Sequence, residues 1–330
     1  MPLNHVWSAK NHRVETSVFQ GSRSGHFWWR RKLLNQALGD RLPIGAKIDS
    51  DFHAQDCVLS QYSDQVHDVF PLSLGEHTIA WRLSGSTSAA MALHPLTSSA
   101  EAPKIYGELP TAIGGSVIAS ASTTSGGTVL NSRLPRPLEV LEQVTPFSSE
   151  WLASQSHATR AFWLEVAQSD AGGPIHGAIR RVVHSQTVEA SWETTDGFSL
   201  GSYVVSTGSA GLRIERMAEP TIFRTFQEAN AGIILGDILE LTLIAQQLSS
   251  NSEKWLADVF RSMYLGFKAT PRVDLLTLKS ATVCRVVAHV MEYQQFVGDL
   301  PSPSLYQAVL AKLPGFLQGD VERSGICLGG

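Results

Sequence analysis

Aspartate and histidine side chains near the N-terminus have the residue types that catalysis and metal binding use. They fall within 29 residues of one another: Asp49, Asp51, His53, Asp56, His67, Asp68 and His77. Asp51 and His53 are two residues apart, so on a strand they would share one face and could supply two metal ligands. The spacing matches no established metal pattern, and both residue types are common on surfaces. The block leaves open a hydrolase site or a set of separate surface side chains, and we predict no metal site.

Serine, cysteine and glycine motifs give no stronger indication of an active site. Ser209 lies between two glycines, but a nucleophile elbow needs a glycine where Thr207 stands. Neither GxGxxG nor GxxxxGK[ST] occurs, which disfavours the common nucleotide-binding enzymes. Cys284 belongs to an apolar stretch, where a thiol is inert. We therefore predict no catalytic residue and no cofactor, and an enzyme is disfavoured.

The most unusual segment is His26–Leu34, in which two tryptophans adjoin three cations. Such residues could stack on bases while neutralising phosphates, or anchor a partner protein. On an amphipathic helix they could instead lie on a membrane surface, or pack with tryptophans inward and cations outward. We predict that one set contacts a protein interface or a nucleic acid: Arg23, His26, Trp28, Trp29, Arg30, Arg31 and Lys32.

Charge is unevenly distributed along the chain. Residues 1–47 hold eight Lys or Arg and two acidic residues, whereas residues 48–80 hold six acidic residues and no Lys or Arg. The net charge of the 330 residues is −4, and only 17% of them are charged. The two blocks either neutralise each other within the fold, or the basic arm contacts something outside it.

Cysteine content and hydropathy bear on location. Cys57, Cys284 and Cys327 are odd in number and far apart, which disfavours a disulfide framework or a zinc site. The first residues lack the apolar core of a signal peptide. The most apolar long stretch, 231–248, contains two acidic residues and is too polar for a membrane span. We expect a location in the cytoplasm or within an assembled particle such as a virion.

Local patterns predict the elements that would position these residues. Strands are predicted at 13–20 and 79–83 and a helix at 27–38, while the Ser/Thr/Gly-rich tract 84–132 favours a linker or a long surface loop. After a helix at 149–168, a β-meander is predicted over 175–183, 188–192, 198–205 and 212–217, with a tight turn at Asp196-Gly197. Helices are then predicted at 221–248, 253–266, 271–298 and 303–314. The third of these is apolar on nearly every face, which indicates burial at the centre of a bundle.

The fold class expected from these elements is α+β, with a β-rich, meander- or sandwich-like N-terminal region followed by a helical C-terminal subdomain. Three parts are expected. They are a β-rich region with the basic arm and the Ser/Thr/Gly-rich loop at 1–135, a helix plus β-meander at 136–220, and a helical subdomain at 221–330.

The function expected from the sequence is that of a non-enzymatic structural or assembly protein, a viral capsid or shell-associated subunit. Missing catalytic motifs, a lightly charged surface and the basic arm motivate this hypothesis. Its partners would be itself or other structural subunits and, at the arm, RNA, with no membrane span and no small-molecule substrate. Two alternatives are a hydrolase that uses the 49–77 block and a nucleic-acid-binding protein that uses the basic, aromatic segment.

Overall fold

The structure is a computed structural model that divides into two units. It describes residues 3–319 apart from 11–13, 22–25, 34–60, 64–65, 70, 76–77, 96–105, 121–131, 144–146, 190–191, 196, 209–210, 219–221 and 297. The first unit comprises Met1–Ala92 and Thr195–Thr221, and the second comprises Leu93–Thr194 and Ile222–Gly330. The boundaries between these units lie at 92/93, 194/195 and 221/222.

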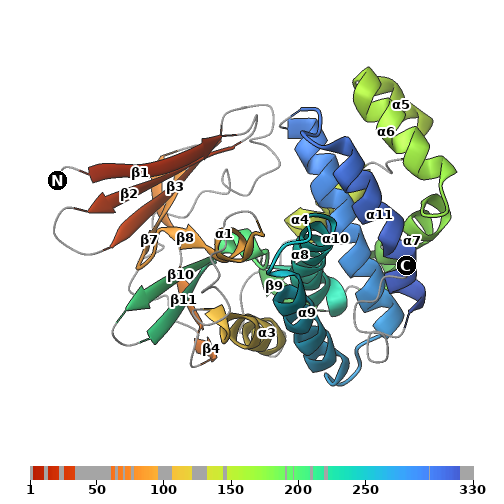
Figure 1. The fold of residues 1–330 in the computed structure, drawn as a ribbon. Helices are drawn as coiled ribbons and strands as arrows, with labels where there is room; N and C mark the ends of the chain where they lie inside the picture. Colours follow the sequence, from red (N-terminus) through yellow and green to blue (C-terminus); the bar gives the residue numbers. More distant parts are fainter. Residues whose placement is uncertain are drawn as a thin grey trace. The chain divides into compact units, whose positions relative to one another are not determined.

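The first unit is built from two five-stranded sheets (Figure 1). One has the strand order β1-β2-β3-β7-β6 and is antiparallel throughout. Its strands are β1 (Leu3–Lys10), β2 (Val14–Gly21), β3 (Phe27–Leu33), β6 (Leu72–Gly75) and β7 (Thr78–Leu83). The other has the order β4-β5-β11-β10-β8, with β5 and β11 parallel. Its strands are β4 (Gln61–Ser63), β5 (Val66–Val69), β8 (Thr87–Ser88), β10 (Tyr203–Gly208) and β11 (Gly211–Met217).

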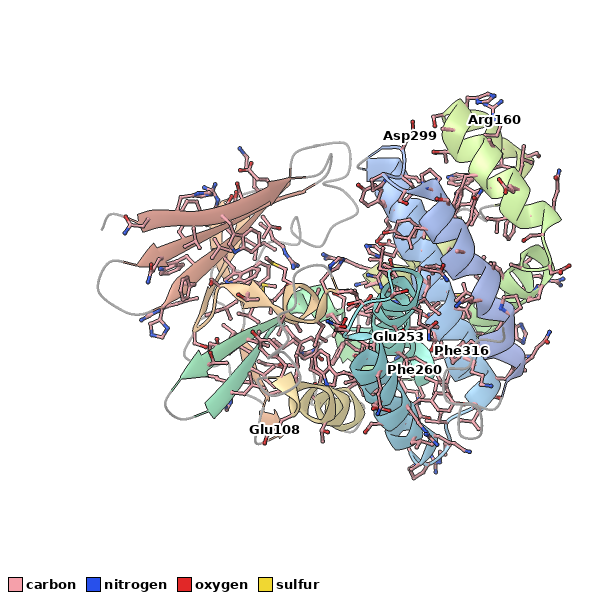
Figure 2. The ribbon with its side chains drawn as sticks, in the orientation of Figure 1. Glu108, Arg160, Glu253, Phe260, Asp299 and Phe316 are labelled. Carbon is pink, nitrogen blue, oxygen red and sulfur yellow. The ribbon has the colours of Figure 1, made fainter. Side chains whose placement is uncertain are left out.

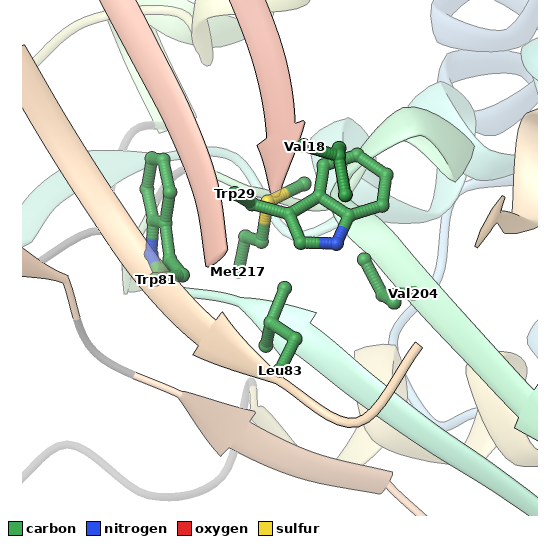
Figure 3. Close-up of a cluster of buried hydrophobic side chains, with 6 residues drawn as sticks. All are labelled: Val18, Trp29, Trp81, Leu83, Val204 and Met217. Atoms are coloured by element: carbon green, nitrogen blue, oxygen red, sulfur yellow. The ribbon is translucent and has the colours of Figure 1, made fainter. Parts of the chain in front are cut away.

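Side chains from both sheets form one hydrophobic cluster (Figure 3). Its buried members are Val18, Trp29, Trp81, Leu83, Val204 and Met217. The two buried indoles keep a hydrogen-bond partner, as burial of an N–H requires. Nε1 of Trp29 donates to the carbonyl of Gly85 at 2.8 Å, and Nε1 of Trp81 donates to the carbonyl of Ala218 at 3.3 Å. Apolar packing between the two sheets therefore stabilises this unit.

The helix predicted at 27–38 is wrong, because Phe27–Leu33 forms strand β3. Trp29 lies opposite Val18 on β2 and opposite Trp81 on β7. Aromatic and β-branched side chains that face one another across strands stabilise a sheet. The partners of Trp29 in these pairs lie outside the segment 27–38. The sequence of that segment alone therefore does not reveal them.

Helices form most of the second unit (Figure 1). They are α3 (Leu109–Ser120), α4 (Arg136–Gln143), α5 (Ser149–Ser154), α6 (His157–Gln168), α7 (Gly172–Glu189), α8 (Glu228–Gln247), α9 (Glu253–Lys268), α10 (Leu275–Phe296) and α11 (Pro303–Gln318). The described residues also form short segments: α1 (Ala89–Leu93), the 3₁₀ turn η3 (Leu200–Ser202), and the strands β9 (Trp192–Thr195) and β12 (Ile222–Thr225). A β-rich N-terminal region followed by a helical C-terminal part confirms the α+β fold class.

Helix α10 is central to the second unit, as its apolar sequence predicts. It packs against α4, α7, α8 and α11. Neighbouring helices are also joined by aromatic contacts, such as that between Phe260 of α9 and Phe316 of α11, whose ring centroids are 5.6 Å apart (Figure 2). None of the helices within the described ranges is both long and apolar enough to cross a membrane.

The first half of the predicted β-meander is wrong at 175–183 and at 188–189, which belong to helix α7, whereas 190–191 lie outside the described residues and Trp192 begins strand β9. Ile175, Ile179 and Val182 are buried at intervals of four and three residues, the spacing of one helix face. The second half of the meander is present as the β10–β11 hairpin. Within the Ser/Thr/Gly-rich tract, helix α3 occupies 109–120, and 121–131 lie outside the described residues.

Candidate functional site

Four charged side chains meet where α8 packs against α10. Nε of Arg285 donates to Oδ1 of Asp237 at 2.6 Å, and Nδ1 of His289 lies 2.7 Å from Oε2 of Glu240. Asp237 and Glu240 are three residues apart on α8, and Arg285 and His289 are four apart on α10. Each pair therefore occupies one face of its helix. Asp237 pairs with Arg285 and the later Glu240 pairs with the later His289, so the two helices run parallel at this point.

Two glycines allow α8 and α10 to approach closely at the charged cluster. A Cβ at Gly236 would lie 2.7 Å from the Thr282 carbonyl oxygen and would overlap the Arg285 side chain. A Cβ at Gly232, one turn earlier, would lie 2.9 Å from the Ala281 carbonyl carbon. The Gly-x-x-x-Gly spacing thus sets the distance between the helices, and that distance brings Arg285 and His289 within reach of the carboxylates.

The beginning of α10 is also held by α8. The backbone N–H of Asp274 donates to Oε1 of Glu228 at 2.7 Å, and Oδ1 of Asp274 accepts from the backbone N–H of Thr277 at 2.8 Å. Asp274 therefore caps α10 while Glu228 holds the cap. This second attachment fixes the register of the two helices, so the positions of Arg285 and His289 are determined from both ends.

Glu240 and His289 form a carboxylate–histidine pair at the edge of the cluster. The Glu240 side chain is only 4% exposed, whereas that of His289 is 43% exposed. The negative charge of Glu240 raises the pKa of His289, although burial and the charge of Arg285 oppose the shift. A partly exposed imidazole whose Nδ1 is held by a carboxylate can give or accept a proton at its other nitrogen.

Two further side chains are electrostatically coupled to Glu240. Burial lowers the pKa of His94, and the charge of Glu240 only partly opposes that effect. Burial also raises the pKa of Tyr306 above its usual range, and the Glu240 charge adds to it. His289 is therefore shifted toward its charged form and His94 toward its neutral form, while the phenol of Tyr306 stays protonated. Groups whose pKa values are pushed apart are typical of acid–base sites.

The described residues of the basic, aromatic segment lie in or next to strand β3 of the first unit and do not form a free arm. Trp29 is buried, whereas Trp28 and Arg30 lie on the opposite face of β3. The Arg30 guanidinium lies 5.1 Å from the Phe19 ring centroid, and that of Arg31 lies 5.4 Å from the Trp81 ring centroid.

For the other members of this set, Lys32 is exposed, His26 is half-buried, and Arg23 lies outside the described residues. As contacts to a protein or a nucleic acid, the set stays a prediction.

The Asp/His block is largely outside the described residues, which include only His67 and Asp68 of its seven members. These two are consecutive on β5, so they point to opposite faces of the sheet. Asp68 accepts hydrogen bonds from Nε and Nη2 of Arg216, each at 2.6 Å, and both side chains are 1% exposed. It is therefore used in a buried ion pair. Across the described ranges, no three His, Cys, Asp or Glu side chains are grouped as metal ligands.

The cluster on α8 and α10 is absent from the sequence-based predictions. There, Asp237 and Glu240 count only as polar interruptions of an apolar stretch, and the second helix is considered for packing alone. A usable signal was present: acidic residues lie three apart in one largely apolar helix, and cations lie four apart in another. Buried charges need partners of opposite sign, so the two sets predict each other.

Comparisons with known proteins give similarities at the level of structure. No protein-family model and no curated protein matches the sequence. A spectinomycin phosphotransferase, APH(9)-Ia, solved with ADP and spectinomycin, aligns with 94% of this chain and 88% of its own at 10% identity and a TM-score of 0.45.

Two further structures are similar. Aminoglycoside phosphotransferase APH(3'')-Id from Streptomyces rimosus aligns with 86% of this chain and 91% of its own, at 10% identity and a TM-score of 0.42. Macrolide 2'-phosphotransferase MphH from Brachybacterium faecium aligns with 97% of this chain and 93% of its own, at 12% identity and a TM-score of 0.35.

These comparisons correct the functional hypothesis drawn from the sequence. The sequence-based prediction of a non-enzymatic capsid or shell subunit is contradicted and we withdraw it: the solved structures that align with the chain are phosphotransferases. The expectation of structural or RNA partners without a small-molecule substrate is withdrawn with it. The fold gives a physical reason: the presumed basic arm is a strand whose Trp29 lies in the core.

Proposed function

We propose that this chain is an enzyme that acts on a small molecule, with the Glu240–His289 pair as its proton-transferring group. The observation that carries the proposal is the 2.7 Å contact between Nδ1 of His289 and Oε2 of Glu240. The carboxylate is buried while the imidazole is 43% exposed, so the ring can meet a ligand while Nδ1 remains held. A positioned imidazole contributes about 10²–10⁴-fold to a proton-transfer step.

Each neighbour has a role in this proposal. Glu240 orients the ring and stabilises its charged form. Arg285 neutralises part of the acidic charge, and its contact with Asp237 keeps the guanidinium in place. Tyr306, protonated at neutral pH, is a hydrogen-bond donor toward a substrate oxygen or toward Glu240. The chemistry is proton transfer to or from a bound molecule.

The test is turnover of small molecules by the full chain. A panel of hydroxylated and amine-containing compounds, with and without Mg²⁺ and ATP, is incubated with protein and followed by mass spectrometry. The incubations with Mg²⁺ and ATP are included because a structurally similar protein was solved with ADP. We expect consumption of at least one compound by the wild type. His289→Gln should slow it by about a hundredfold, because a general acid–base group is removed.

A matched control keeps the test specific. His157 is an exposed histidine at the start of α6, so His157→Gln removes an imidazole without touching the cluster. This variant should retain wild-type turnover and wild-type thermal stability. Equal turnover by His289→Gln and the wild type would overturn the proposal, as would a panel in which no compound is consumed.

A further inference from the structure

A basic face of helix α7 points to a second role for this protein. Buried positions recur along the helix every three or four residues, and this buried side packs against α4, α6, α10 and α11. Its exposed side carries one stripe: Gly173, His176, Gly177, Arg180, Arg181, His184, Thr187 and Val188. No acidic residue occurs between 172 and 188. Two arginines and two histidines thus lie on one face, and the only acidic residue of the helix is Glu189 at its C-terminal end.

The arginines of this face are not engaged in ion pairs with any residue that the structure describes. Arg180 and Arg181 are not among the residues that form an ion pair in the described part of the chain. By contrast, exposed Arg160 on the preceding helix donates to the backbone carbonyls of Leu152 and Ala153. The α7 arginines are therefore free to bind a group from outside.

The helix that presents this face is firmly held. Ile175, Ile179 and Val182 are almost fully buried. Near the C-terminal end, Gln186 donates from Nε2 to Oγ of Ser132 at 2.7 Å, and its Oε1 accepts from Oγ1 of Thr225 at 2.7 Å. A rigid helix presents its side chains at fixed spacing, which lowers the entropy lost when a partner binds.

We propose that this face docks an acidic segment of a partner protein. The four basic positions run from His176 to His184, which spans about 12 Å along a helix. Arginine binds carboxylates in a bidentate manner, so Asp and Glu side chains fit both Arg180 and Arg181. A Cβ at Gly173 or Gly177 would meet nothing within 4 Å, so the backbone of a partner can approach the helix there.

The small number of cations favours a protein segment over a nucleic acid. Salt-dependent binding to a phosphate backbone rests on about 6–10 neutralised phosphates. This face offers only two permanent cations, Arg180 and Arg181, which is too few for that mode of binding. Exposed Val188, 65% accessible at the end of the stripe, adds an apolar contact that a peptide can use.

The experiment measures binding of a fluorescent peptide of about eight glutamates, which spans roughly 26 Å when extended, to the full chain by anisotropy at low salt. Replacing both residues, Arg180→Glu with Arg181→Glu, should weaken binding by about tenfold or more, since like charges then oppose each other. The matched control is Lys254→Glu with Arg261→Glu on α9, two exposed cations with the same change of net charge. Its binding should stay within about twofold of the wild type.

Thermal unfolding of each variant checks that the fold is kept. If the double glutamate variant unfolds the chain, the double variant Arg180→Gln with Arg181→Gln is used in its place. The proposal is overturned if the α9 control weakens binding as much as the α7 variant does. It is also overturned if the wild type does not bind the peptide. Tighter binding of a single-stranded oligonucleotide or of phosphatidylserine vesicles through the same arginines would reassign the face to those ligands and equally overturn it.

Discussion

Replacing Asp68 by asparagine is expected to lower the free energy of unfolding of the β-sheet unit by about 3–5 kcal/mol. Asp68 on β5 and Arg216 on β11 are register partners in parallel strands, and each side chain is 1% exposed. Two hydrogen bonds of 2.6 Å join them, and the Arg216 guanidinium also lies 4.0 Å from the Phe198 ring centroid. Asparagine removes the negative charge and leaves the guanidinium charge buried without its counter-ion.

Hydrogen exchange of the β10–β11 amides reports this loss, because their slowest exchange requires opening of the sheet unit. Because each tenfold change in exchange rate corresponds to about 1.4 kcal/mol, exchange should be faster by roughly 10²- to 4 × 10³-fold. The double variant Asp68→Leu with Arg216→Met should recover most of the protection, since apolar residues of similar volume replace buried ion pairs at little cost. A change of less than about tenfold in the single variant would contradict the stabilising role of this ion pair. So would a double variant whose amides are no better protected than those of the single variant.

Substituting valine for Gly236 is expected to cost about 3 kcal/mol and to disrupt the charged cluster as well. The new side chain would overlap Arg285 and approach the Thr282 carbonyl oxygen, which belongs to backbone and cannot move away independently. Helix α10 must shift, and His289 moves with it away from Glu240. Urea unfolding followed by the circular dichroism of the helices measures the loss of stability, and the pKa of His289 should fall in the same variant.

The control for this substitution is Gly266→Val on α9, an exposed helical glycine at which a Cβ would meet nothing within 4 Å. Valine there replaces glycine in a helix without overlap, so stability should change by less than about 0.5 kcal/mol. Equal effects of the two substitutions would show that Gly236 matters only through helix propensity, and not through the distance between α8 and α10.

Much of the helical unit is predictable because its patterns are local. The capping sequence before Glu253, the proline at 303 and the continuous apolar sequence of α10 each indicate a helix within one stretch of chain. The segments around Trp29 and Ile179 gave wrong predictions for opposite reasons. At Trp29 the cross-strand partners decide in favour of a strand, and at Ile179 a short alternating stretch conceals the spacing of a helix face.

The candidate site could not be predicted from local pattern, because its pairs are formed by helix packing. Asp237 and Arg285 are 48 residues apart, and Glu240 and His289 are 49 apart. Their meeting depends on the parallel approach of α8 and α10, which Gly232 and Gly236 permit. The sequence contains the complementary charges, but which charge meets which follows only from the register of the two helices.

The central claim, that Glu240 and His289 form a proton-transferring pair, is tested most directly by the pKa of His289. It is measured by nuclear magnetic resonance of the imidazole ring in the wild type and in Glu240→Gln. Because Glu240 favours the charged ring, we predict a wild-type pKa above the ordinary value of about 6.5. The pKa should fall in Glu240→Gln, where burial and the Arg285 charge act unopposed by Glu240. A wild-type value at or below the ordinary one, or a value that Glu240→Gln leaves unchanged, would contradict the account.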